Sequence, residues 1–179
     1  MELRIEDIDI NTICNLFPHC KACVYWEYPE QFDEPNHGDN SSLKQEWLQT
    51  MIEQFGPCGS ILYVNDEIAA YCQYINPQAV PGISRYQGLM PHVDKDAVLI
   101  TCLWVSGEYQ RKGLGRKLLE EVINRLRNRG FRAVQTIGRD DSANNCSGPT
   151  QFYLGKGFSK VATETYPRGD SYTLLRLDL

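Results

Sequence analysis

The sequence predicts a single mixed α/β domain, of the α+β type, with about seven strands and four helices. Its 179 residues fall within the usual size of one domain, and 42% apolar with 23% charged residues are ordinary globular values. Segments with a hydrophobic period of two alternate with segments of period 3.6, and no repeat or low-complexity segment separates them. We therefore expect one domain over residues 1–179.

The N-terminus predicts a strand followed by a short helix. Leu3 and Ile5 alternate with acidic residues, as in a strand with one buried face. Asp9 or Asn11 is a suitable N-cap for a short helix that ends at Leu16.

Residues 18–40 differ from the segments around them. They contain three prolines, a glycine, several acids and four large aromatic residues, which predicts a loop-rich stretch. A long helix is expected over residues 41–55, because apolar side chains recur on one face until a Gly-Pro pair stops it.

Two short segments rich in apolar residues predict a β-hairpin. Residues 61–64 and 68–74 flank an Asn-Asp-Glu turn, which has the length of a hairpin connection although it lacks the Asn-Gly signal. Residues 76–96 are polar and rich in proline and glycine, which predicts an irregular connection.

The strongest strand signal in the chain lies at residues 98–105. This nearly unbroken apolar run is typical of a central strand covered on both faces. A helix is expected over residues 113–128, where apolar residues recur at 3.6-residue spacing before Gly130. The remaining elements are a strand at 133–137, a short helix at 150–155 and strands at 158–163 and 172–177.

The composition disfavours several functional classes. No window approaches the roughly 18 consecutive apolar residues of a membrane span, and the first residues lack the basic start and apolar run of a signal peptide. We therefore expect a cytoplasmic protein that does not act at a membrane. The seven cysteines are an odd number without an export signal, so reduced thiols are expected.

The charge of the chain is unevenly distributed. A net charge of −5 disfavours nucleic-acid binding. Residues 108–132 nevertheless carry eight basic and three acidic side chains, a local charge of +5, whereas the rest of the chain carries ten basic and twenty acidic ones. A compact cationic segment on an acidic body suggests one small polyanionic ligand, held at one place.

The cationic segment begins with a glycine-containing turn that opens the predicted helix. The first N–H groups of a helix lack partners, the macrodipole places about half a positive charge there, and glycine lets a phosphate approach the main chain. The alternative is a structural turn with solvated cations. A Walker loop would need Ser or Thr after Gly-Lys, and a dinucleotide fingerprint would need a third glycine at Leu118. The residues of the predicted anion site are Gln110, Arg111, Lys112, Gly113, Leu114, Gly115 and Arg116.

Two sequence motifs lie about 40 residues apart. A strand ending in Val precedes Gln-x-x-Gly-x-Gly at the start of a long helix, and a later short helix carries Tyr with Gly-Phe four and five residues beyond it. The matching residues are Val105, Gln110, Gly113, Gly115, Tyr153, Gly157 and Phe158. In this order and spacing, residues 97–160 resemble the GNAT superfamily of acetyl-coenzyme A dependent N-acetyltransferases.

The resemblance implies a GNAT fold with a central, mixed and mostly antiparallel sheet. It also implies that acetyl-coenzyme A is the acetyl donor and that no metal takes part. Main-chain groups of Leu103 and Val105 would pair with the pantetheine arm in a gap beside the central strand. The N–H groups of residues 111–116 would hold the pyrophosphate.

The resemblance assigns Tyr153 to the thioester sulfur. A thiolate leaving group with a reference pKa of about 8.5 could take a proton from a tyrosine, whose reference pKa is about 10. The alternative is a core aromatic residue on the face of a helix. The family often has Asn seven residues before this Tyr, whereas this chain has Cys146 there, preceded by Asn144 and Asn145.

The acceptor amine must lose a proton before it can attack. An alkyl amine with a pKa near 10.4 is only about one part in two thousand neutral at pH 7, a shortfall of about 4.6 kcal/mol. Histone-acetylating family members carry a Glu six residues before the strand-ending valine, where this chain has Leu99. The candidates left open are Glu27, His92, Asp94 and Asp96, or a water chain to solvent.

The acceptor site is predicted at Tyr25, Trp26 and Glu27. In the GNAT fold the connection between the first two helices lines the acceptor pocket, and aromatic walls with one carboxylate suit an ammonium group. Packing of these residues in the core is the alternative. A zinc site on Cys20 and Cys23 lacks a second paired spacing, and a redox Cys-x-x-Cys lacks the preceding thioredoxin-type strand.

We therefore predict an N-acetyltransferase that transfers acetyl directly to a primary amine of a small, cationic acceptor, as a monomer or homodimer. No cysteine has an identifiable His and acid partner in the sequence, so no acetyl-enzyme intermediate is expected. The alternatives are a protein lysine or N-terminal acetyltransferase and a non-catalytic coenzyme A binding module of the same fold.

Overall fold

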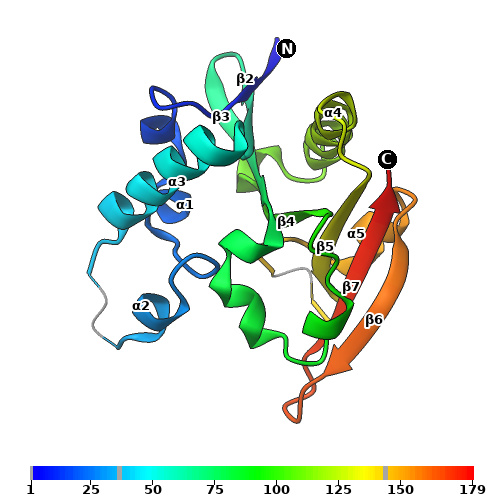
Figure 1. The fold of residues 1–179 in the computed structure, drawn as a ribbon. Coiled ribbons are helices and arrows are strands. Elements are labelled where there is room, and N and C mark those ends of the chain that lie inside the picture. The colour runs from blue at the N-terminus through cyan, green and yellow to red at the C-terminus, as the bar shows by residue number, and fades with distance from the viewer. Residues whose placement is uncertain (1, 36–37, 143–144) are drawn as a thin grey trace.

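The computed structural model describes residues 2–35, 38–142 and 145–179 and contains a seven-stranded sheet in the order β1-β2-β3-β4-β5-β7-β6 (Figure 1). Strands β4 and β5 are parallel and the other neighbouring pairs are antiparallel, which confirms the predicted mixed, mostly antiparallel sheet. The strands are β1 (Leu3–Asp7), β2 (Gly59–Val64), β3 (Glu67–Ile75), β4 (Val98–Val105), β5 (Ala133–Arg139), β6 (Ser159–Thr165) and β7 (Ser171–Asp178).

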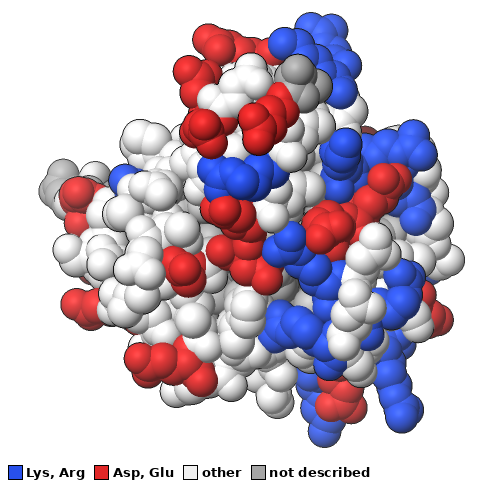
Figure 2. Space-filling view, turned by 90° about the horizontal axis from the view of Figure 1, so that it is seen from above, with Lys and Arg blue, Asp and Glu red and all other residues white. Residues whose placement is uncertain are grey.

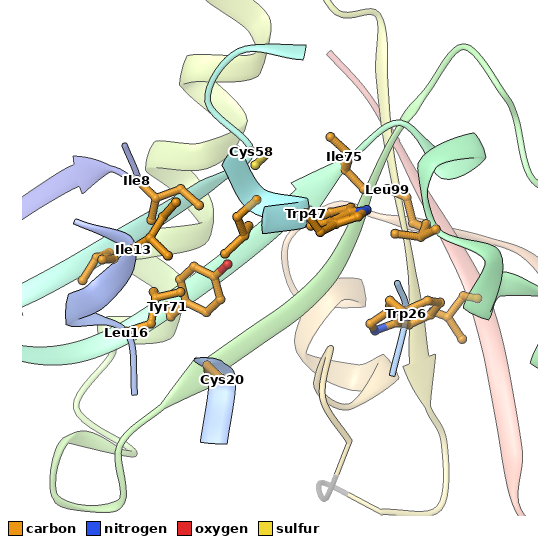
Figure 3. Packing of buried hydrophobic residues seen from close by; sticks show 14 of the residues in the cluster. Ile8, Ile13, Leu16, Cys20, Trp26, Trp47, Cys58, Tyr71, Ile75 and Leu99 are labelled. Carbon is orange, nitrogen blue, oxygen red and sulfur yellow. The ribbon is translucent and has the colours of Figure 1, made fainter. Parts of the chain in front are cut away.

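Helices cover both faces of the sheet (Figure 1). One apolar core joins the sheet to the N-terminal helices, and Figure 3 shows Trp47, Ile75 and Leu99 within it. A second core joins the opposite face to α4 and α5. The helices are α1 (Pro18–Ala22), α2 (Pro29–Asp33), α3 (Ser41–Phe55), α4 (Leu114–Asn128) and α5 (Thr150–Leu154).

Strand β4 is buried on both faces at its start. Leu99 belongs to the first core and the next residue, Ile100, to the second, because successive strand residues point to opposite faces. The sequence prediction of a central strand at residues 98–105 is therefore confirmed.

Helix α4 follows the predicted apolar period. It starts after Gly113 and buries one face against β2, β3 and β4. Each buried Leu contributes about 1.5–3 kcal/mol relative to an exposed one, so this face fixes how the helix lies on the sheet. The buried residues are Leu114, Leu118, Leu119, Val122, Ile123 and Leu126.

The β2–β3 hairpin is confirmed, with a two-residue turn. Asn65 and Asp66 have φ of 49° and 67°, which is the left-handed conformation that a type I′ turn requires at both positions. Asn and Asp tolerate this conformation better than other non-glycine residues, which is why the turn forms without an Asn-Gly pair.

The N-terminal region differs from the sequence prediction. In place of a helix that ends at Leu16, the structure has a single 3₁₀ turn at Ile13–Asn15. The loop-rich stretch contains the short helices α1 and α2, which begin at Pro18 and Pro29. Proline is favoured at the first helical position because its fixed φ suits a helix and its missing N–H would be unpaired there. None of the described helices is long and apolar enough to cross a membrane.

Strands β4 and β5 separate after a short parallel ladder. Their pairing runs from Val98 with Val134 to Ile100 with Thr136, whereas β4 continues to pair with β3 as far as Val105. Among the described residues, the second half of β4 therefore has no strand partner on its β5 side. The segment after β5 approaches this edge, where the N–H of Leu103 donates to the carbonyl of Cys146 at 2.8 Å.

Candidate active site

A cleft that we call the outer groove, of about 530 Å³, lies where β4 and β5 separate. A smaller hollow of about 290 Å³ adjoins it at the start of α4. Of the nine predicted cofactor residues, eight line one or both of these cavities, and Lys112 instead lies over the ring of Tyr109. The groove is lined by Leu103, Trp104, Val105, Gln110, Arg111, Gly115, Asn145, Gly148, Pro149 and Phe152.

The N-terminus of α4 is built to receive an anion. Its N-cap is Gly113, no side chain caps it, and the first turn carries no acidic residue. The helix therefore presents unpaired N–H groups and a partial positive charge. Figure 2, seen from above, shows Lys and Arg side chains gathered on the side of the molecule where α4 lies. The predicted anion site and the cationic surface thus coincide.

Backbone conformation at the turn leaves room for a ligand. Arg111 has a φ of 57°, which a non-glycine residue adopts rarely, and Gly113 has a φ of 79°. No atom lies within 4 Å of the position that a Cβ would occupy at Gly113. At Gly115 a Cβ would stand 3.1 Å from Cγ2 of Val105, so glycine lets the helix approach the strand.

Gln110 fastens this turn to the end of β4. Its side-chain amide donates to the carbonyl of Val105 at 3.0 Å, although the side chain is exposed. The sequence assigned Gln110 to cofactor binding, and this assignment stays a prediction. The structure adds a bond that holds the turn against the strand.

Tyr153 is fully buried behind the outer groove. Its hydroxyl donates to the carbonyl of Ser147, and its neighbour Phe152 lines the groove instead. Burial raises the pKa of Tyr153 well above its ordinary value, so the phenol keeps its proton. The role of Tyr153 as the acid stays a prediction, and it requires the hydroxyl to exchange the Ser147 carbonyl for the sulfur.

A second cavity, the inner cavity, has a volume of about 200 Å³ and lies on the other side of Trp104. The two cavities share Trp104 and Asn145. Its lining consists of His19, Cys20, Cys23, Trp26, Lys44, Tyr71, Gln73, Cys102, Trp104, Asn145 and Cys146.

Of the three predicted acceptor residues, Trp26 lines the inner cavity. Cys20, from α1, lines the same cavity. Tyr25 lies outside the lining, where its hydroxyl is 3.0 Å from that of Tyr86 and its ring lies under the guanidinium of Arg85. The remaining residue, Glu27, is buried beneath the cavity.

Glu27 forms a buried ion pair with Lys44. Lys44 Nζ and Gln73 Nε2 both donate to Glu27 Oε1, the latter at 2.7 Å, and the two ionic side chains are 5% exposed or less. Burial is the largest single influence on Lys44 and acts to lower its pKa, but the charge of Glu27, the hydrogen bond to it and the nearby Cys23 and Cys102 together leave this pKa raised. Glu27 therefore does not line the cavity itself, but it is bonded to Lys44 and Gln73, which do. Its assignment as acceptor ligand and base stays a prediction.

Lys44 is a site residue that was not predicted from the sequence. Its position in the helix does indicate burial, because Lys44 stands three and four residues before Trp47 and Leu48 and so shares their buried face. A lysine on the apolar face of a helix needs a buried counter-ion, and an acid elsewhere in the chain must supply it.

Asn145 is another lining residue without a role assigned from the sequence. Its amide donates to the carbonyl of Ile137 at 3.2 Å and to Oγ of Ser147 at 3.0 Å, which ties down the segment after β5. The family motif places Asn at the position of Cys146, so the amide is displaced by one residue. Asn144, the other asparagine of this segment, lies outside the described residues.

The acids that precede β4 line neither the outer groove nor the inner cavity, and their assignment as candidate bases stays a prediction. Asp94 forms an ion pair with Arg176, and both Asp94 and Asp96 lie before Val98. Trp104 follows Val98 by six positions in the strand, which corresponds to about 20 Å. His92 also lies before Val98, and its assignment as a base likewise stays a prediction.

Four free cysteines surround the inner cavity. A hydrogen bond with Cys20, together with burial, raises the pKa of the Cys102 thiol well above its ordinary value. Burial also raises the pKa of Cys23, and that of Cys146 to about 12. Among the described residues, no group of three or more His, Cys, Asp and Glu side chains is arranged to hold a metal ion.

The fold is shared by many solved structures. An agmatine N-acetyltransferase is 15% identical, with 99% of both chains covered and a TM-score of 0.70. The polyamine N-acetyltransferase of Drosophila melanogaster, which forms N-acetylagmatine, is 16% identical over 99% of this chain and 100% of that one, with a TM-score of 0.67. The yncA protein of Salmonella typhimurium, solved with its cofactor acetyl-CoA, is 18% identical over 98% and 93%, with a TM-score of 0.63.

Sequence comparison identifies the family. A search of curated protein sequences gives no match. A sequence model of the acetyltransferase (GNAT) family matches residues 21–148, which is well over half of the chain. The chain therefore belongs to the GNAT family of acetyltransferases.

Proposed function

We propose that this chain, as one domain over residues 1–179, transfers the acetyl group of acetyl-coenzyme A directly to a primary amine of a small, cationic acceptor. The observation that carries the proposal is the junction of the two cavities at Trp104 and Asn145. A thioester held in the outer groove and an amine held in the inner cavity would meet there. Holding both reactants together makes the transfer effectively unimolecular.

The outer groove has the features that the donor requires. The N-terminus of α4 and its cations suit the pyrophosphate, and the edge of β4 that lacks a strand partner suits the pantetheine arm. The N–H of Leu103 is already bonded to Cys146. A bound pantetheine arm would therefore contact Leu103 through other atoms or displace this bond.

The thiols of the inner cavity support direct transfer. The nucleophilic form of cysteine is the thiolate, and the raised pKa values of Cys23, Cys102 and Cys146 keep these groups protonated at neutral pH. An acetyl group therefore has no activated thiol among these three to occupy on its way to the amine.

Three observations favour a small cationic amine as acceptor. The inner cavity has room for a small molecule, and the rings of Trp26 and Trp104 form part of its wall. Outside residues 108–132 the chain is strongly acidic, which attracts cations. Two proteins of the same fold are named for agmatine and polyamine acetylation.

A thiol-release screen with acetyl-coenzyme A tests this function. Polyamines, agmatine, aminoglycosides, amino acids and short peptides would be compared, and a cationic amine should give the highest kcat/KM. Loss of one ring face in Trp26→Ala should lower kcat/KM about 2- to 30-fold, the equivalent of about 0.5–2 kcal/mol. Met90→Ala, which removes an exposed apolar side chain outside both cavities, is the matched control.

Three results would overturn the proposal. An anionic best substrate would exclude the cationic acceptor. Preferential labelling of proteins in a lysate would indicate a protein acetyltransferase. Binding of acetyl-coenzyme A without thiol release from any amine would indicate a non-catalytic module.

A further inference from the structure

His19 stands at the rim of the inner cavity. It is the second residue of α1, and its ring meets the ring of Trp104 edge-on, with centroids 4.6 Å apart. Phe17 stacks against the imidazole with centroids 5.6 Å apart and an interplanar angle of 16°. Because Trp104 is shared by both cavities, these contacts hold the imidazole beside their junction.

The imidazole is held by ring contacts and keeps its nitrogens available. Among the described residues, neither a hydrogen bond nor an ion pair engages its side chain. The residue is exposed to solvent on one side and lines the cavity on the other. A proton taken up from inside the cavity can therefore leave to bulk water.

We propose that His19 is the general base of the acetyl transfer, an inference that rests on the function proposed above. The ammonium form of the acceptor gives one proton to the free imidazole nitrogen. The amine nitrogen then forms a bond to the acetyl carbon while the bond from that carbon to sulfur breaks. The second amine proton ends on the sulfur as a free thiol, and the imidazolium releases its proton to solvent.

The other ionisable groups of the cavity are poorly suited to this task. The lining contains one histidine and no carboxylate. Lys44 from α3 is held charged by Glu27 beneath it, and the pKa of Tyr71 from β3 is raised well above its ordinary value by burial. Thiols face the cavity from α1 at Cys20, from its C-cap at Cys23, from β4 at Cys102 and from the segment after β5 at Cys146, and a thiol ordinarily titrates near 8.5.

The protonation state of His19 agrees with this role. Partial burial lowers the pKa of His19 from its ordinary value of about 6.5, so the ring is neutral at pH 7. A neutral imidazole accepts a proton, whereas an imidazolium cannot. Activity should therefore rise with pH through the lowered pKa of His19 and level off above it.

The test compares His19→Gln with the wild type, using the best amine from the screen. In the wild type, kcat/KM should show a rising limb with an apparent pKa below about 6.5. In His19→Gln, kcat/KM at pH 7 should fall about 100-fold and this limb should disappear. Affinity for acetyl-coenzyme A should stay within about twofold, because His19 does not line the outer groove.

Two further variants separate catalysis from damage to α1. Lys21→Gln changes the same helix but lies outside the inner cavity, so it should keep the wild-type kcat/KM and pH profile. Added imidazole should restore at least part of the activity of His19→Ala, because the side chain that it replaces is open to solvent.

The outcomes distinguish this inference from the proposed function. If the wild type is active but His19→Gln keeps its kcat/KM and rising limb, His19 is not the base while the function stands. Loss of activity that imidazole does not restore, with the rising limb still present, overturns the assignment in the same way. Absence of thiol release from every amine in the wild type overturns both.

Discussion

The outer groove and the inner cavity are built in different ways. Most of the groove comes from one stretch of chain, residues 103–116, in which a strand end, a turn and a helix start follow one another. Its key groups are main-chain N–H groups and glycine positions. The inner cavity takes side chains from α1, the segment between α1 and α2, α3, β3, β4 and the segment after β5. Its polar floor is the ion pair between Glu27 and Lys44, which are 17 residues apart in the sequence.

The two cavities therefore differ in how strongly they depend on side-chain identity. A helix N-terminus presents N–H groups whatever its side chains are, so a groove of this kind tolerates many sequences. A cavity made by side chains from six parts of the chain changes with any of them. The acceptor would therefore be set by residues that are scattered along the chain, and the donor by one short motif.

Removing the ion pair between Glu27 and Lys44 tests whether the inner cavity depends on its side chains, and we expect the largest effect here. Glu27→Gln leaves the ammonium of Lys44 buried without its counter-ion, and we expect a loss of about 3–5 kcal/mol in the free energy of unfolding, measured with urea. The double variant Glu27→Gln with Lys44→Met should regain most of this loss, because no unpaired charge remains.

Glu6→Gln is the matched control for the ion pair. Glu6 pairs with Arg4 at the surface, where both side chains are about two-fifths exposed, so its loss should cost under about 1 kcal/mol. If Glu27→Gln costs no more than this control and instead abolishes turnover, Glu27 acts in the reaction and the ion pair is not what builds the cavity.

Gly113→Glu tests whether the groove depends on its main chain. The new carboxylate would occupy the open space in front of α4, repel a pyrophosphate and strain a residue with a φ of 79°. We expect affinity for acetyl-coenzyme A, measured by titration calorimetry, to fall about 1000-fold, or about 4 kcal/mol. Gly107→Glu, at an equally open position outside both cavities, should change it less than about threefold. Equal affinities of the two variants would contradict the anion site.

Tyr153→Phe tests whether the hydroxyl of Tyr153 acts in the reaction or belongs to the core. If the hydroxyl protonates the leaving sulfur, kcat should fall about 100-fold with unchanged affinity for acetyl-coenzyme A. Tyr74→Phe removes a different buried hydroxyl, bonded to Ser60, and should leave kcat unchanged. If Tyr153→Phe keeps the wild-type kcat and lowers the free energy of unfolding by about 1 kcal/mol, the hydroxyl has a structural role, in which it donates a hydrogen bond to the carbonyl of Ser147.

Sequence patterns were sufficient for the sheet and the long helices. The seven strands and helices α3 and α4 appear close to their predicted positions, because apolar residues recur at a regular spacing in the helices and alternate or form short apolar runs in the strands. Helices α1, α2 and α5 have five residues each, too few for a period to show. The family motif marks α5, whereas α1 and α2 begin at Pro18 and Pro29 in a segment whose composition is typical of a loop.

The sequence was enough to predict the family, a mixed and mostly antiparallel sheet, and an anion site at residues 110–116 that stays a prediction, since these depend on short-range pattern and spacing. Only the tertiary structure decided that Glu27 faces Lys44, that Tyr25 lies outside the cavity and that His19 stands beside Trp104. The reason is physical: main-chain groups are placed by local secondary structure, whereas side chains far apart in sequence meet through the packing of the whole core.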